Sequence, residues 1–72
     1  MTTTELRQAL QELNGQRDLE IVLTHILSPD HAACYVKKAM LIPAEADQLV
    51  KVTDGRHIFI IDAERVAWLR IG

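Results

Sequence analysis

The segment QLVKVTDGRHIFIID, residues 48–62, carries the strongest local structural signal in the chain. Its two apolar runs are rich in β-branched residues, and between them stands Asp54-Gly55, a dipeptide typical of the turn that joins two antiparallel strands. We therefore expect strands over about 48–53 and 56–62. A type I′ turn of two residues would join them, because its twist matches that of the flanking strands.

A strand-like alternation of residues also extends to both sides of this hairpin. After it, Asp62-Ala63-Glu64-Arg65 predicts a tight connector, a single 3₁₀ turn, and residues 66–71 predict the last strand. Before it, the same pattern predicts strands over about 19–27 and 33–42. Ser28-Pro29-Asp30-His31 is expected to join these two strands as a turn, since proline presets φ at its second position.

The N-terminal residues have the pattern of a short amphipathic helix. Thr2 and Glu5 have the spacing of a capping box, in which each side chain accepts a hydrogen bond from a backbone N–H of the first turn. Apolar residues then recur at helical spacing. They are Leu6, Ala9, Leu10 and Leu13. We expect a helix over about residues 3–13, ended by a left-handed cap at Asn14-Gly15.

The predicted order is one helix followed by five short strands, all in a single domain over residues 1–72. We expect a mostly β fold, in which a strongly bent five-stranded antiparallel sheet forms a small barrel. Curling is favoured because short strands with adjacent pairings must otherwise find a partner to bury both faces. The alternative is an α+β fold with one helix on an open antiparallel sheet.

The composition favours association of identical chains. The chain is 49% hydrophobic and has 72 residues, and a domain of this size buries only about 60% of its unfolded surface. The last strand, residues 66–71, would be an aggregation hazard if it stayed unpaired, and pairing with residues 58–61 of another copy would remove that hazard. The expected interface residues are Ile58, Ile60, Val66, Trp68, Leu69 and Ile71.

The run IFIIDAERVAWLRI, residues 58–71, and the order of the elements resemble the Sm-like (LSm) family. The resemblance implies a helix, a bent five-stranded barrel, and rings in which strand four of one subunit pairs with strand five of the next. Asp62-Ala63 departs from the Arg-Gly or Lys-His pair of that family, and residues 39–53 lack a clear counterpart of its base-holding Asp and Asn. The resemblance therefore covers architecture and ring formation, not a nucleotide pocket, and an SH3-like barrel would have almost the same strand order.

The charge of the chain bears on nucleic-acid binding. A formal net charge of −2 argues against a duplex-DNA-binding protein, because neutralising phosphates requires a basic excess. Contacts with single-stranded RNA would come from four cations and one tyrosine: Lys37, Lys38, Lys51 and Arg56 for phosphates, and Tyr35 for a base. Lys51 and Arg56 would be neighbours across the predicted hairpin. The alternative is that these lysines keep strand faces and edges soluble.

Catalytic and metal-binding patterns are weak. The residues that could bind a metal are His25, His31, Cys34 and His57. One His-x-x-Cys pair is poor evidence, because structural zinc sites combine two close pairs with several cysteines. A Cys–His nucleophile would need an orienting third group and an oxyanion site, and the chain has no P-loop, no dinucleotide-binding glycine motif and no nucleophile elbow. We expect no metal, no cofactor and no enzymatic activity.

The single cysteine, Cys34, excludes an intrachain disulfide and suits a reducing, cytoplasmic setting. The N-terminus lacks the pattern of a signal peptide, and the longest near-uncharged apolar run, residues 39–44, is far short of the roughly 20 residues that cross a bilayer.

Two hypotheses about function follow from the sequence. The first is a homo-oligomeric Sm-like ring that binds single-stranded RNA, and the second is a non-catalytic protein-interaction or structural module without nucleic-acid binding.

Overall fold

The computed structural model describes residues 1–24 and 32–72. The elements in order are helix α1 (Thr3–Leu10), strands β1 (Asn14–Leu23), β2 (Ala33–Leu41), β3 (Val50–Thr53) and β4 (Ile58–Ile61), the 3₁₀ turn η2 (Ala63–Arg65) and strand β5 (Val66–Ile71). The turn expected at residues 28–31, and the end of the first expected strand at residues 25–27, lie outside the described residues.

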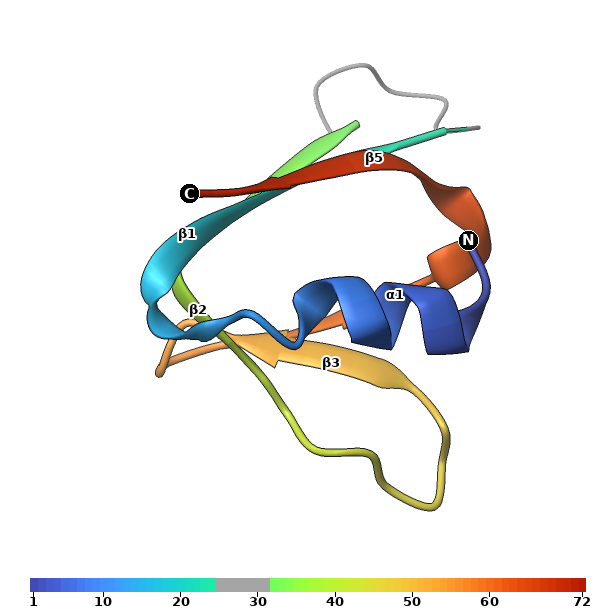
Figure 1. Cartoon of the computed structure of the whole chain (residues 1–72), viewed down its shortest axis with the longest axis horizontal. Coiled ribbons are helices and arrows are strands. Elements are labelled where there is room, and N and C mark those ends of the chain that lie inside the picture. The colour runs from blue at the N-terminus through green and yellow to red at the C-terminus, as the bar shows by residue number, and fades with distance from the viewer. Residues whose placement is uncertain (25–31) are drawn as a thin grey trace.

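The five strands form one antiparallel sheet in the order β4-β3-β2-β1-β5. The sheet bends strongly, so that β3 and β5 lie on opposite sides of the core and α1 lies alongside β3 (Figure 1). Among the described residues, β4 pairs with β3 and β5 pairs with β1, but β4 and β5 do not pair with each other. The chain is therefore mostly β, and its sheet is not closed into a barrel. This arrangement fits the alternative of one helix on an open antiparallel sheet.

The helix starts as predicted and ends earlier. The backbone N–H of Thr2 donates to Glu5 Oε1 over 2.8 Å, and the backbone N–H of Glu5 donates to Thr2 Oγ1 over 3.1 Å, which confirms the capping box. The helix ends at Leu10, with a right-handed cap at Gln11. Asn14-Gly15 is not the cap, because residue 14 already pairs with β2 and begins strand β1.

A pair of irregularities bends the sheet between β1 and β2. The register shifts on both sides of Arg17, which pairs with Ala39. At the second shift, the backbone N–H of Lys38 donates to Asp18 Oδ1 over 2.9 Å, and Lys38 has a left-handed φ of 49°. Extra residues on one strand of a ladder bend that strand and increase its twist. The bend therefore arises where β1 extends toward the helix, and its β1 residues precede the strand predicted from residue 19, whereas Lys38 lies within the strand predicted over 33–42.

The β3–β4 hairpin has a longer loop than predicted. Thr53 pairs with Ile58, so residues 54–57 all belong to the loop. Asp54 Oδ1 accepts hydrogen bonds from the backbone N–H groups of Arg56 over 2.8 Å and His57 over 2.7 Å. Asp54 also lacks the positive φ that a type I′ turn requires at its first central residue. The expected two-residue turn is therefore wrong, because the carboxylate organises a wider one.

The core lies inside the bend and consists of aliphatic side chains. They are Leu6, Leu10, Leu13, Leu19, Ile21, Val36, Ala39, Val50, Val52, Ala63 and Val66. Leu6 and Leu10 of the helix have no exposed surface, and α1 contacts β3 and η2. The helix stripe thus closes one side of the core. The predicted 3₁₀ turn at 63–65 and the last strand at 66–71 are confirmed.

Candidate functional site

The two outermost strands of the sheet expose large apolar side chains. On β4, Ile58 is 63% exposed and Ile60 is 60% exposed, whereas Phe59 and Ile61 turn toward the core. On β5, Trp68 is 51% exposed. Each strand is hydrogen-bonded to one neighbour only among the described residues. The two free edges therefore combine unpaired backbone groups with exposed apolar side chains, which is the usual chemistry of a β-pairing surface.

The other expected interface residues lie deeper. Leu69 and Ile71 are half-buried and pack against the core. Val66 is buried, because the ladder between β1 and β5 shifts register where Leu23 pairs with it. Val66 thus belongs to the core of the single chain, and its part in an interface stays a prediction.

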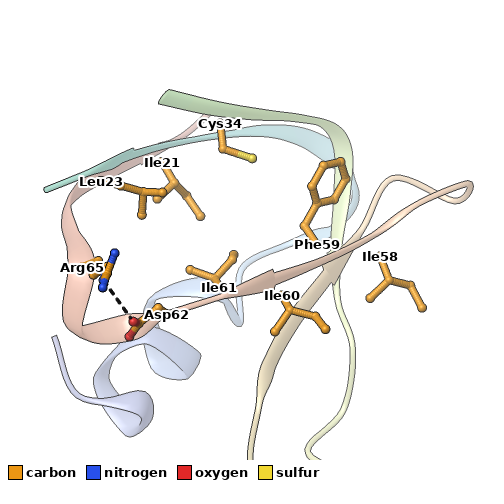
Figure 2. A pocket seen from close by; sticks show the side chains of 9 residues that line it. All are labelled: Ile21, Leu23, Cys34, Ile58, Phe59, Ile60, Ile61, Asp62 and Arg65. Carbon is orange, nitrogen blue, oxygen red and sulfur yellow. Dashed lines mark ion pairs between the residues drawn. The ribbon is translucent and has the colours of Figure 1, made fainter. Parts of the chain in front are cut away.

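An apolar cleft of about 430 Å³ lies beside β4. Figure 2 shows Ile21, Leu23 and Cys34 pointing into it from β1 and β2, and Phe59 and Ile61 pointing into it from β4 on the opposite side. Burial raises the pKa of the Cys34 thiol, so the protonated thiol behaves as part of the apolar wall. The sequence pattern does not reveal this cleft, because its walls come from strands whose facing depends on the bend of the sheet.

One end of the cleft carries its only charged lining residues among those described, Asp62 and Arg65. Arg65 Nε lies 3.5 Å from Asp62 Oδ2, a long distance for a charge-assisted hydrogen bond. Asp62 Oδ1 accepts from the backbone N–H of Glu64 over 3.1 Å, which caps η2. The 3₁₀ turn thus holds both charged side chains at the end of the cleft (Figure 2).

The candidate RNA-binding cations differ in their surroundings. Lys51 Nζ lies 2.7 Å from Asp47 Oδ2 and 3.2 Å from Glu45 Oε1, and the hydrogen bond to Asp47 is the main cause that raises the pKa of Lys51. Lys51 pairs with Ile60 in the sheet rather than facing Arg56. That expected pair is therefore wrong, since Arg56 belongs to the hairpin loop.

The remaining candidates lie on β2 and are exposed. They are Tyr35, Lys37 and Lys38. Tyr35 is 66% exposed, and its hydrogen bond to Glu20 of β1 raises the pKa of its hydroxyl. Arg70 of β5 pairs with the same carboxylate, with Arg70 Nη2 2.7 Å from Glu20 Oε1. The tyrosine is thus tied to an ion pair, whereas Lys37 and Lys38, like Arg56 of the hairpin loop, have no ion-pair partner among the described residues.

The histidine and cysteine set is only partly described. Within residues 1–24 and 32–72, there is no group of three or more His, Cys, Asp or Glu residues that could hold a metal ion. His57 Nδ1 lies 3.3 Å from Asp54 Oδ2 and so belongs to the β3–β4 loop. His25 and His31 lie outside the described residues.

The chain matches no protein family, no curated protein and no solved structure. Among the described residues, every helix is too short or too polar to cross a membrane. The function must therefore be inferred from the residues and surfaces of the chain itself.

Proposed function

We propose that this protein is a non-catalytic, Sm-like homo-oligomeric ring, in which β4 of one copy pairs with β5 of the next. The observation that carries the proposal is that both terminal strands of an open sheet have exposed large apolar side chains, Ile58 and Ile60 on one and Trp68 on the other. A head-to-tail contact between two different edges forms a ring when the rotation between copies closes. The strong bend of the sheet favours such a rotation.

Pairing of the two edges would satisfy two physical requirements at once. The free backbone N–H and C=O groups of β4 would bond to those of β5 in the next copy, which removes an aggregation-prone edge. Each isoleucine or tryptophan side chain that moves out of water would stabilise the contact between copies by about 25 cal/mol for each Å² of apolar surface that it buries. Outward-facing Trp68 would then lie on the same side of the continued sheet as Ile58 and Ile60.

The test is the solution mass of the full chain over a range of concentrations, by light scattering or sedimentation. We expect a defined multiple of 8.1 kDa, accompanied by a blue shift of the emission of Trp68, the only tryptophan. Ile60→Lys should shift the mass toward the monomer. Leu49→Lys is the matched control, since Leu49 is 43% exposed but precedes β3, an interior strand. A stable monomer at high concentration would contradict the proposal.

Binding of single-stranded RNA is a second candidate function of the ring. It is favoured by Lys37 and Lys38, which are exposed neighbours and have no ion-pair partner among the described residues. Repetition of this pair around a ring would produce a band of positive charge. Phosphate neutralisation by such a band supplies salt-dependent affinity.

A gel shift with a short single-stranded RNA at several salt concentrations tests this function. Replacing both Lys37 and Lys38 by Gln should weaken binding and reduce the salt slope by roughly 0.7 for each phosphate that is no longer neutralised. Lys51→Gln is the control, because Lys51 is already ion-paired with Asp47 and Glu45, and its effect should be smaller. An intact ring that does not bind RNA at low salt would exclude RNA binding and favour the protein-interaction module.

A further inference from the structure

We propose that the apolar cleft beside β4 binds an aliphatic monocarboxylate, with its hydrocarbon chain between the two walls and its carboxylate on Arg65. This inference goes beyond the proposed assembly. Ile58 and Ile60 also line the cleft, but their side chains leave β4 on the side opposite to those of Phe59 and Ile61 (Figure 2). The cleft and the proposed assembly surface therefore share strand β4.

The size and lining of the cleft define the body of the ligand. Its volume of about 430 Å³ falls in the range of roughly 300–1,000 Å³ that is typical of small-molecule sites. Leu23, Cys34, Phe59 and Ile61 are only partly buried, so their apolar surface is available for a ligand to cover. Because the walls present aliphatic groups, one phenyl ring and one thiol, the enclosed part of the ligand needs no hydrogen-bonding groups.

The charged end of the cleft selects a carboxylate. The guanidinium of Arg65 makes no hydrogen bond to another described residue, and its ion pair with Asp62 is long, at 3.5 Å. Asp62, by contrast, already accepts a hydrogen bond as the cap of η2. An arginine side chain carries several N–H donors in a planar fork that fits a carboxylate with two parallel bonds. The free binding capacity at this end is therefore that of a cation.

The test uses the full chain and three probes with the same hydrocarbon: octanoate, octanol and octylammonium, each below the concentration at which it forms micelles. Cys34 lies in the wall, so the rate of its alkylation by neutral iodoacetamide reports occupancy of the cleft. Of the three probes, octanoate should slow the alkylation of Cys34 at the lowest concentration. Because hydrogen bonds to charged groups are worth about 1.5–3 kcal/mol, octanol should need a concentration at least about tenfold higher for the same effect. Octylammonium should not slow alkylation.

Two arginine variants separate the carboxylate contact from general charge. Arg65→Gln should reduce protection by octanoate to the level of octanol, whereas Arg56→Gln, in the hairpin loop, should leave it unchanged. Circular dichroism confirms that each variant is folded, and the three-probe comparison on the native chain decides the matter if Arg65→Gln does not fold. Equal protection by all three probes, or none by octanoate, would overturn the inference.

Sedimentation of the same samples distinguishes this inference from the proposed assembly. Protection of Cys34 by octanoate without a change in mass supports a ligand site in the cleft, whatever the oligomeric state is. Protection that occurs only when octanoate changes the mass would mean that association covers Cys34, and would overturn the ligand site.

Discussion

The two sides of the core use the same kind of residue with opposite results. On the helix side, Leu6 and Leu10 have no exposed surface, and the capping box at Thr2 and Glu5 fixes the start of the helix that carries them. On the β4–β5 side, Ile60 and Trp68 remain exposed and a cleft stays open. The helix covers one side of the core, whereas the other side keeps apolar side chains exposed and a cleft open.

The difference follows from what covers each side. An amphipathic helix presents one apolar stripe and needs only one partner surface, here β3. An edge strand must satisfy its free backbone groups as well as its outward-facing side chains.

The largest expected effect is a mutation on the closed side. Leu10→Ala should lower the free energy of unfolding by about 2–5 kcal/mol, since it removes a fully buried side chain and leaves a cavity. Leu49→Ala, at a 43% exposed position, should change the free energy of unfolding by less than about 1 kcal/mol. Urea denaturation measures both. Equal effects would show that the helix is not part of a consolidated core.

A second comparison is made within β4 itself. Ile61→Ala should lower the free energy of unfolding by about 1–2 kcal/mol because this half-buried side chain packs against the core, and Ile60→Ala by less than about 1 kcal/mol. The experiment is run at a concentration low enough for the monomer, because association raises apparent stability. A larger loss for Ile60 at that dilution would mean that β4 faces the opposite way.

The bend offers a smaller effect. Lys38 has a left-handed φ of 49°, whereas Lys37 does not. Relief of the left-handed strain, about 1–2 kcal/mol, is offset by the extra flexibility of glycine in the unfolded chain, about 0.5–1 kcal/mol. Lys38→Gly should therefore be neutral or stabilising, and Lys37→Gly destabilising by about 0.5–1 kcal/mol. Thermal unfolding that ranks the two in the reverse order would contradict this account of the bend.

The smallest effect concerns the loop that supports β4. Hydrogen bonds from the backbone N–H groups of His57 and Arg56 lower the pKa of Asp54 from 3.8 to about 2. A pKa that is lower in the folded chain stabilises the fold above the ordinary value, and this contribution is lost as the pH falls from 3.8 through about 2. Asp54→Asn should therefore flatten the pH dependence of stability in that window, as measured by urea midpoints. A profile identical to that of the native chain would exclude this role.

The local elements could be predicted from the order of the residues alone. The capping box at Thr2 and Glu5, the 3₁₀ turn at residues 63–65 and the strand at 66–71 were predicted where they occur, because each depends on neighbouring residues alone. The interface residues Ile58, Ile60 and Trp68 were also found to be exposed. Their pairing with another copy remains a prediction.

The remaining features depend on how the elements pack against one another. The early start of β1, the bend at Lys38, the burial of Val66 and the cleft lined by Cys34 all depend on the register between strands that are distant in the sequence. Register is set by the sum of many long-range contacts, whereas a periodic pattern reports only which residues share a face. Neighbouring residues therefore specified the helix start, the 3₁₀ turn and the last strand. The packing of these elements against one another determined which side of the core stayed open.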